Sequence, residues 1–256
     1  MKSINIISRF CLLPFAIACN MSIAKQNELP VQKQTSDSGF AVLELFTSEG
    51  CSSCPAADAV LEKLLEEYDG KVFALGFHVD YWDRLGWTDS FSSAAYSKRQ
   101  EKYAVLFHLN SIYTPQVVIN GKNEMVGSDG SNIKHTILKE LQAAATQTIT
   151  LQTKTVSEKN ISVSYTINKT ANAVLNIALV QLHAETAVKR GENGGRTLKH
   201  INVVRDFKTI QANELLEGRI NLDIPEGLSA RDCKVIAYLQ DANDFHVKAG
   251  VEALLQ

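Results

Sequence analysis

The chain has 256 residues, more than one average domain of about 100–150 residues and enough for two modest ones. Hydrophobic residues make up 45% and charged residues 21%, the balance of an ordinary soluble globular protein, which excludes a largely disordered, collagen-like or coiled-coil chain. The formal net charge is −2, and Lys and Arg are not clustered, so no basic face for nucleic acid is expected. Five cysteines are too few for a disulfide-stapled mini-scaffold, so their positions matter more than their number.

The N-terminal segment has the pattern of a secretory signal. Lys2 and Arg9 precede an uncharged apolar stretch, residues 10–18, which is too short to span a bilayer. The alternative, an amphipathic first helix of the fold, is disfavoured because the apolar stretch has no polar face. We therefore expect the protein to be exported, to the periplasm or beyond the cell.

Two processing sites are compatible with this signal. Residues 16–18 (AIA) before Cys19 resemble a bacterial lipoprotein site, which would place a lipid on Cys19 and anchor the protein to a membrane. Residues 22–24 (SIA) form a small-x-small site for the ordinary signal peptidase. The signal peptide is therefore predicted as residues 1–24, or as residues 1–18 with a lipidated Cys19.

Three segments are expected after the signal. Residues 25–39 are polar and without periodicity, which is typical of a flexible leader. A first domain is expected over residues 40–146, where strand-like and helix-like patterns alternate, and a second over residues 147–256, where strand-like patterns dominate.

The order of elements in the first domain narrows the fold. Residues 41–46 are an apolar run of strand length, and apolar residues recur at helical spacing over residues 60–68. Residues 72–79 read as a second buried strand, so the strand–helix–strand order implies a parallel pair with a right-handed crossover. Residues 91–107 favour an amphipathic helix, and Pro115 opens a third strand.

A hairpin and a last helix complete this domain. Asn120-Gly121 is a strong two-residue turn between residues 117–119 and residues 123–126. Ser131 is expected to cap the last helix.

Cys51 and Cys54 stand two residues apart at the predicted start of the first helix. Thiol–disulfide exchange needs a thiolate within reach of a second thiol, and this spacing provides it. The unpaired N–H groups and dipole of a helix start stabilise a Cys51 anion, so Cys51 would attack and Cys54, shielded one turn in, would resolve. Glu49 opposes the thiolate, so the direction of the reaction, oxidation or reduction, is open. The alternatives are a static structural disulfide and half of a zinc site, for which no second CxxC or HxxxH pair is present.

The CxxC, the helix start and the strand-initial proline together resemble the thioredoxin fold over roughly residues 40–145. The resemblance implies that Thr114–Pro115 is a cis bond beside the CxxC, whose exposed backbone pairs with an extended substrate. The alternative is a trans proline that begins a strand. The resemblance also implies a buried carboxylate that takes the proton of the second thiol. Glu44 is a candidate, offset by one residue from the usual spacing.

The segment HVDYWDRLGWTD after the second strand holds both tryptophans of the chain. Because parallel strands end on the same side of a sheet, this segment should project near the CxxC. Trp82 and Trp87 are predicted to form an apolar docking wall for substrate, with Asp80 and His78 supplying polar contacts. The alternative is an aromatic-packed loop that closes over the sheet. His78 is also a weak candidate copper ligand together with Cys51 and Cys54, since thiolates and imidazole suit Cu(I).

The second domain has the pattern of an antiparallel β-sandwich. Residues 161–167 alternate apolar and polar side chains, residues 172–182 and 235–239 read as further strands, and Gly, Asn and Asp turns lie between them. Cys233, at the start of a strand, is interpreted as a buried and inert thiol.

The segment RGENGGRTLKHINVVR is the most distinctive stretch of the second domain. No GK[ST] follows its glycines, so it is not a phosphate-binding loop. It is predicted as a long inter-strand loop that brings Arg190, Arg196, Arg205 and His200 together, either to receive a carboxylate or the other domain. The alternative is a solvated loop with salt bridges.

The segments ELFTSEGCSSCPAAD, HVDYWDRLGWTD, YTPQVVINGK and RGENGGRTLKHINVVR resemble a family of exported bacterial thioredoxin-like proteins of unassigned function. The resemblance implies the fold and export but no substrate. The prediction is an α/β thioredoxin-like domain followed by an antiparallel β-sandwich domain, acting without a cofactor as a thiol–disulfide oxidoreductase on thiol- or disulfide-containing proteins. The alternative is a non-enzymatic binding protein, for copper or a partner protein, with a structural disulfide.

Overall fold

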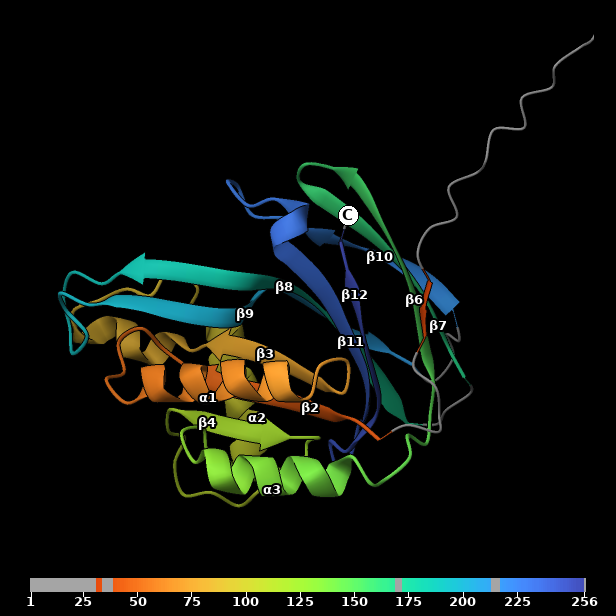
Figure 1. Cartoon of the computed structure of the whole chain (residues 1–256), viewed down its shortest axis with the longest axis horizontal. Helices are drawn as coiled ribbons and strands as arrows, with labels where there is room; N and C mark the ends of the chain where they lie inside the picture. The colour runs from red at the N-terminus through yellow and green to blue at the C-terminus, as the bar shows by residue number, and fades with distance from the viewer. Residues whose placement is uncertain (1–30, 34–38, 169–171, 213–216, 256) are drawn as a thin grey trace, which may run out of the picture.

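An eight-stranded mixed sheet runs through the protein, with helices on both of its faces and a four-stranded antiparallel sheet at one end (Figure 1). This computed structural model describes residues 31–33, 39–168, 172–212 and 217–255. The predicted signal peptide, its two cleavage sites and the lipidated Cys19 lie outside the described residues.

The first part of the chain builds one half of the large sheet and all three α-helices of the described residues. Its elements are β2 (Ala41–Thr47), α1 (Cys54–Glu67), β3 (Val72–His78), α2 (Ala94–Leu106), β4 (Gln116–Ile119), β5 (Asn123–Val126) and α3 (Gly130–Glu140). Strand β2 pairs parallel with β3 and antiparallel with β4, which pairs antiparallel with β5. The predicted order of strand, helix, strand, helix, two strands and helix is confirmed.

The turns of this part follow their local sequence, with one exception. Asn120 and Gly121 have φ values of 48° and 68°, as the predicted two-residue hairpin requires. The prediction that Ser131 caps α3 is wrong. The cap is Asp129, whose side chain accepts a hydrogen bond from the backbone N–H of Asn132 at 3.1 Å, because the helix begins one residue before Ser131.

The second part of the chain is built of strands. They are β6 (Ile149–Ser157), β7 (Asn160–Ile167), β8 (Ala173–Ala187), β9 (Thr197–Gln211), β10 (Glu217–Asp223), β11 (Cys233–Asp241) and β12 (Val247–Leu254). The large sheet has the order β12-β11-β8-β9-β3-β2-β4-β5, and the small sheet has the order β1-β6-β7-β10. Strand β1 (Val31–Lys33), inside the predicted leader, pairs antiparallel with β6.

The two predicted domains share the large sheet. Strand β9 runs parallel to β3, with Val203 opposite Gly76, so one sheet contains strands from both sides of residue 146. A Cβ at Gly76 would lie 3.3 Å from the carbonyl oxygen of Asn202, which is why a glycine suits this junction. Asn202 takes a left-handed backbone conformation there, with φ 52°, and its side chain donates to the carbonyl of Ala74 at 3.1 Å.

The described residues form three hydrophobic cores between these layers. Leu43 and Leu45 of β2 pack with α1 and α3 on one face of the large sheet, whereas Val42 and Phe46 pack with α2 on the other. Figure 1 shows α1 and α3 in front of the sheet and α2 behind it. The third core joins β8, β11 and β12 of the large sheet to the small sheet.

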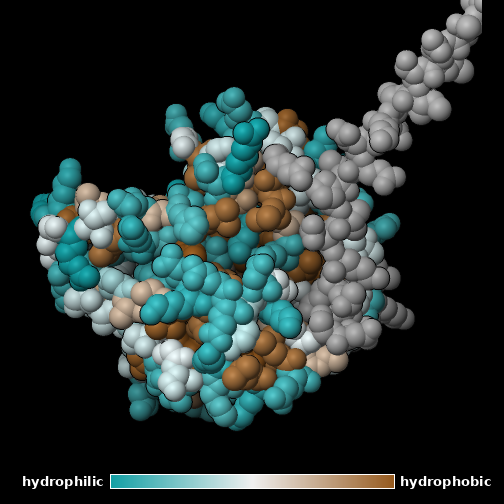
Figure 2. All heavy atoms as spheres, viewed as in Figure 1, coloured by the Kyte–Doolittle hydropathy of each residue, from teal (hydrophilic) through white to brown (hydrophobic). Residues whose placement is uncertain are grey.

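The surface carries its apolar residues in separate areas. Figure 2 shows them among hydrophilic residues on the face that is viewed in Figure 1. Among the residues that the structure describes, the exposed large hydrophobic side chains are Leu85, Val105, Val126, Leu138, Val156 and Leu254. No helix within the described ranges is long and apolar enough to cross a membrane.

Candidate functional site

A disulfide joins Cys51 and Cys54 in the turn between β2 and α1, with their Cα atoms 5.4 Å apart. The backbone N–H of Cys51 donates to the carbonyl of Ser48, and that of Cys54 donates to the carbonyl of Cys51, both at 3.2 Å. Cys54 is the first residue of α1, so it lies at the helix start and not one turn inside it as predicted. Both cysteines are only 1% exposed, whereas Ser52 and Ser53 between them are exposed. The predicted shielding of Cys54 therefore extends to Cys51.

Trp82 connects the disulfide turn to the segment before β4. The Thr114–Pro115 bond is cis, as the resemblance to thioredoxins implied. The indole N–H of Trp82 donates to Oγ1 of Thr114 at 2.9 Å. The same side chain packs against Gly50, where a Cβ would lie 3.1 Å from the Cβ of Trp82. One tryptophan thus touches both the residue before Cys51 and the residue before Pro115.

Trp87 contacts the residue two positions before Cys51 and the loop between β8 and β9. Its indole N–H donates to Oε2 of Glu49 at 2.7 Å, and a Cβ at Gly191 would lie 3.3 Å from its Cβ. Both tryptophans are partly buried, and their N–H groups are used within the protein. The carboxylate of Asp80 accepts a hydrogen bond from the Ser97 hydroxyl of α2 at 2.5 Å. The roles of Trp82, Trp87 and Asp80 in binding a substrate stay predictions.

The loop between β8 and β9 binds the disulfide turn. The fully buried amide of Asn193 donates to the carbonyls of Glu49 and Cys51, both at 2.9 Å. Arg196 donates to Oδ1 of Asn193 at 2.7 Å, and the backbone N–H of Ser52 donates to Oε2 of Glu192 at 3.1 Å. The predicted inter-strand loop is confirmed, and it contacts the first part of the chain.

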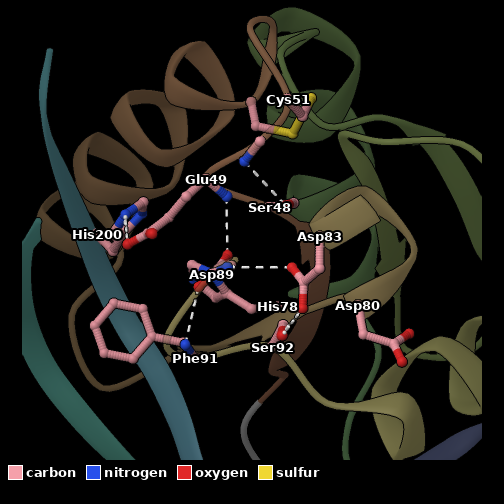
Figure 3. A network of polar contacts seen from close by, with 12 residues as sticks. Ser48, Glu49, Cys51, His78, Asp80, Asp83, Asp89, Phe91, Ser92 and His200 are labelled. Carbon is pink, nitrogen blue, oxygen red and sulfur yellow. Dashed lines mark hydrogen bonds and ion pairs between the residues drawn. A yellow bond between two sulfur atoms is a disulfide. The ribbon is translucent and has the colours of Figure 1, made fainter. Parts of the chain in front are cut away.

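His200 of β9 meets two carboxylates beside this turn. Its Nε2 lies 3.5 Å from Oε1 of Glu49, and its Nδ1 lies 3.4 Å from Oδ2 of Asp58 on α1 (Figure 3 shows the contact with Glu49). Burial disfavours the charged imidazole, but the neighbouring carboxylates of Asp58 and Glu49 raise the pKa of His200 to about 9. The prediction that this stretch receives carboxylates therefore holds for His200, whereas Arg205 bonds the side chain of Gln181.

A second histidine–carboxylate pair lies next to the first. Nδ1 of His78 lies 2.6 Å from Oδ2 of Asp89, and the rings of His78 and His200 are 4.8 Å apart. Burial opposes the charged form of Asp89, but His78 and the backbone N–H groups of Glu49 and Phe91 hold the pKa of Asp89 below its ordinary value (Figure 3).

Metal binding receives no support from the part of the chain that the structure describes. No group of three His, Cys, Asp or Glu side chains is placed there to hold a metal ion. The copper candidate His78, proposed together with Cys51 and Cys54, pairs instead with Asp89.

Glu44 is not placed to take the proton of the Cys54 thiol, the role that the resemblance to thioredoxins implied. Its carboxylate lies on the α2 side of β2, where it accepts hydrogen bonds from Arg99 at 2.8 Å, from Tyr103 at 2.6 Å and from Tyr238 at 3.1 Å. Side chains of a strand alternate between faces, so Glu44 points away from α1 while Leu43 and Leu45 point toward it. The offset of Glu44 by one residue from the usual thioredoxin spacing therefore places its side chain on the wrong face of β2 for the predicted role.

Cys233 is free and fully buried in the core between the two sheets, as predicted. Burial raises the pKa of its thiol to about 11, which disfavours the reactive thiolate.

Sequence reasoning missed two residues of this site, Asp58 and Asn193. Asp58 follows Cys54 by four residues, and helical spacing alone places both on one face of α1, a signal that was available. Asn193 gave no such signal, because its contact with Cys51 spans 142 residues of chain.

Comparisons with known proteins agree with this architecture. A family model described as "Protein of unknown function (DUF1223)" matches residues 42–240. The search of the curated proteins found no match. A crystal structure of protein AGR_C_4864 from Agrobacterium tumefaciens is similar, with 27% identity and a TM-score of 0.62 over 84% of this chain and 93% of that one. The protein HBP35 of Porphyromonas gingivalis, at 19% identity and a TM-score of 0.57 over 87% of this chain and 77% of that one, shows similarity of fold alone.

Proposed function

We propose that this chain, which belongs to the DUF1223 family of proteins of unknown function, is an exported thiol–disulfide oxidoreductase. The observation that carries the proposal is the Cys51–Cys54 disulfide at the start of α1, linked through Trp82 to the segment before Pro115. The order of β2, α1, β3, α2, β4, β5 and α3 supports a thioredoxin-like fold for this part. The packing of the small sheet on β8, β11 and β12 supports a sandwich-like second part.

The proposed chemistry uses one cysteine to attack and the other to resolve. In the reduced protein the Cys51 thiolate attacks a substrate disulfide, forms a mixed disulfide and releases one substrate thiolate. Cys54 then attacks the Cys51 sulfur, which closes the protein disulfide and releases the second substrate thiolate. The start of α1 stabilises the Cys51 anion. The backbone at Thr114 and Pro115 would pair with the substrate, and Trp82, Trp87 and Asp80 would line its binding surface.

Two features of the site bear on the reactivity of Cys51. The carboxylate of Glu49, which would oppose a thiolate, is engaged by Trp87 and by His200. The side chain of Cys51 is almost completely covered in the oxidised protein, so a substrate must displace part of its surroundings. The loop that holds Asn193 is one such covering segment, because it bonds the Cys51 carbonyl.

Trapping of substrates tests the proposal directly. The Cys54→Ser variant should accumulate mixed disulfides with other proteins in cells, and Cys51→Ser should not, because only Cys54 can resolve them. Cys233→Ser is the matched control, since it removes a cysteine outside the site and should behave like the wild type. If Cys54→Ser traps nothing and the wild type fails to reduce insulin, the protein is not an oxidoreductase, and the disulfide is structural.

The redox potential of the Cys51–Cys54 pair would show whether the protein oxidises or reduces its substrates. A value near about −120 mV identifies an oxidant and one near about −270 mV a reductant. A value below about −300 mV would contradict the proposal, because it identifies a structural disulfide.

Export and anchoring are part of the proposal and rest on the N-terminal sequence. Labelling of cells with a radioactive fatty acid separates the two processing routes. Loss of label in Cys19→Ala identifies a lipid anchor, whereas an unlabelled wild type that begins at Lys25 identifies ordinary cleavage after Ala24.

A further inference from the structure

A polar pocket lies on the face of the large sheet that α2 covers. It has a volume of about 360 Å³, within the range of about 300–1,000 Å³ that is usual for small-ligand pockets, and it lies between α2 and β9. Tyr96 and Phe207 line it and also belong to the core between α2 and the sheet. In Figure 1, α2 is behind the sheet, whereas α1, which begins at Cys54, is in front. The pocket is therefore separate from the disulfide site.

The charged side chains that line this pocket are mostly positive. They are four cations and one carboxylate, in a chain whose formal net charge is −2: Lys98, Arg99 and Lys102 of α2, and Arg205 and Asp206 of β9. Asp206 already accepts a hydrogen bond from the backbone N–H of Asp223 at 3.0 Å and lies 3.4 Å from Nζ of Lys208. Within the described part of the chain, Lys98, Lys102 and Arg205 make no ion pair. Even with Glu44 bound to Arg99, the cations outnumber the carboxylates, which favours an anionic ligand.

Both arginines have N–H groups that the protein leaves unused. Arg99 bonds its partners through Nε and Nη2, and its Nη1 has no hydrogen-bond partner among the described residues. Arg205 donates from Nη1 to Gln181 at 2.7 Å and stacks on Phe91, 4.8 Å from the ring centre, while its Nε and Nη2 have no partner among those residues. None of these unused nitrogens is buried without a partner, so they are open to solvent. A guanidinium presents its donors as a rigid fork that matches phosphate or carboxylate oxygens.

The two guanidinium groups differ in their electrostatic surroundings. Burial lowers the pKa of Arg205, whereas in Arg99 burial is outweighed by the charge of Glu44, which raises the pKa well above its ordinary value. A half-buried cation without a carboxylate partner is a costly arrangement, which a bound anion would relieve. Arg205 is therefore the lining residue whose charge most needs a ligand.

The number of available donors favours a phosphate group over a carboxylate. A phosphate monoester carries a charge of about −1.5 to −2 at pH 7 and three strong acceptor oxygens, whereas a carboxylate carries one charge and two oxygens. Two guanidinium groups and two ammonium groups match the larger charge and the larger number of acceptors. The rings of Tyr96 and Phe207 and the methyl group of Ala95 add apolar surface for an organic substituent.

We propose that this pocket binds a small organic phosphate monoester. Arg99 and Arg205 donate to the phosphate oxygens, and the two lysines of α2 add positive charge. The organic group lies against the two aromatic rings of the lining. This inference goes beyond the proposed oxidoreductase function and does not depend on it, because the pocket contains neither Cys51 nor Cys54. The two proposals therefore fail in different measurements.

Calorimetric titration of the full chain with phenyl phosphate tests the inference. At about pH 7.5 the wild type should bind it at a single site, and phenyl sulfate, which has a similar shape and one charge, should bind at least about 10-fold more weakly. Arg205→Met should weaken the binding of phenyl phosphate by at least about 10-fold, because it removes charge-assisted hydrogen bonds. Lys102 is exposed, so Lys102→Met should fold, and it should weaken binding by about 3-fold. Arg99 is kept in these variants, because its removal would also break the ion pair with Glu44.

Lys63→Met is the matched control. It removes the same charge from an exposed position of α1, on the other face of the sheet, and should bind phenyl phosphate as the wild type does. The inference is overturned if the wild type does not bind phenyl phosphate at millimolar concentration, or if phenyl sulfate binds equally well. It is also overturned if Arg205→Met and Lys102→Met bind like the wild type, or if Lys63→Met weakens binding as much as they do.

Vesicle flotation separates two sources of the phosphate group. Phosphatidic acid is a phosphate monoester, and phosphatidylglycerol is a diester. Flotation of the wild type, but not of Arg205→Met, with vesicles of phosphatidylcholine and phosphatidic acid supports the inference and identifies a lipid headgroup, provided that phosphatidylglycerol does not replace phosphatidic acid. Binding of phenyl phosphate without flotation supports it equally and identifies a soluble phosphate ester.

Discussion

Two buried clusters of charged side chains lie on opposite sides of β2, and they differ in how completely they are paired. On the α2 side, Glu44 is bonded by Arg99, Tyr103 and Tyr238, and the guanidinium of Arg99 also reaches Gln240 at 3.2 Å. We call this the closed cluster. On the α1 side, the open cluster consists of Glu49, Asp58, His78, Asp89 and His200.

The two clusters differ in hydrogen bonding, and this difference suggests a structural role for the closed cluster and a chemical role for the open one. In the closed cluster, no buried polar side-chain atom lacks a hydrogen-bond partner. In the open cluster, Nε2 of His78, Nε2 of His200 and Oε1 of Glu49 are buried without one. A saturated ionic cluster rigidifies a core, whereas the carboxylates around His200, beside the disulfide turn and an open pocket, shift the pKa of its imidazole. We therefore expect the closed cluster to control stability and the open cluster to control reactivity.

The largest effect is expected from breaking the closed cluster. Arg99→Met leaves the Glu44 carboxylate buried without its cation and should lower the free energy of unfolding by about 3–5 kcal/mol, as measured by denaturant titration. Lys134→Met is the control, because it removes the exposed ion pair with Glu67 and should not change the stability measurably. The comparison fails if Arg99→Met, while still folded, changes the rate at which dithiothreitol reduces the disulfide.

The open cluster should show its charge in the pH dependence of stability. The folded pKa of His200, about 9, lies above the unfolded value of about 6.5. Its contribution is therefore fully present below about pH 6.5 and is lost as the pH rises through about 9. The loss should approach about 3 kcal/mol in wild-type protein and disappear in His200→Gln. His135→Gln, at an exposed histidine of α3, should keep the wild-type profile. Identical profiles for wild type and His200→Gln would show that His200 is not the titrating group.

The loop between β8 and β9 should contribute both stability and protection of the disulfide. Asn193→Ala leaves the buried carbonyls of Glu49 and Cys51 without their donor, at a cost of about 2 kcal/mol in the free energy of unfolding. The same change should speed reduction of the disulfide by glutathione, since the covering loop is released. Asn243→Ala, in the exposed turn before β12, should alter neither quantity. An unchanged reduction rate in Asn193→Ala would mean that the loop does not limit access to Cys51.

The smallest effect is expected at the buried thiol outside both clusters. Cys233→Ala should cost about 1 kcal/mol, because it removes one buried sulfur from the core between the sheets. The redox potential of the Cys51–Cys54 pair should not move. A shift in that potential would reveal a coupling between Cys233 and the site that no contact in the structure explains.

Local sequence was enough to predict much of the fold. The strands and helices from Ala41 to Glu140, the Asn120-Gly121 turn and the position of the CxxC all follow from periodicity and turn residues within a few positions. The pairing of β9 with β3 could not be predicted in this way, because local patterns do not show which strands pair when more than 100 residues separate them. The same limit applies to the site. Its cysteines were predicted from local sequence, whereas the contacts of Asn193 with Cys51 and of Asp58 with His200 exist only because β9 pairs with β3.

The length of β8 and β9 has a consequence for biosynthesis. These strands carry Asn193 and His200 from the far part of the chain to a turn that the ribosome completed about 140 residues earlier. Because a chain is made from its N-terminus, and would leave the cell in that order on the proposed export route, Cys51 and Cys54 would meet oxidants before the groups that cover them exist. On the proposed export route, the first oxidation of the pair would therefore precede the completion of the site, and only the finished chain would give the disulfide its cover and its buried charges.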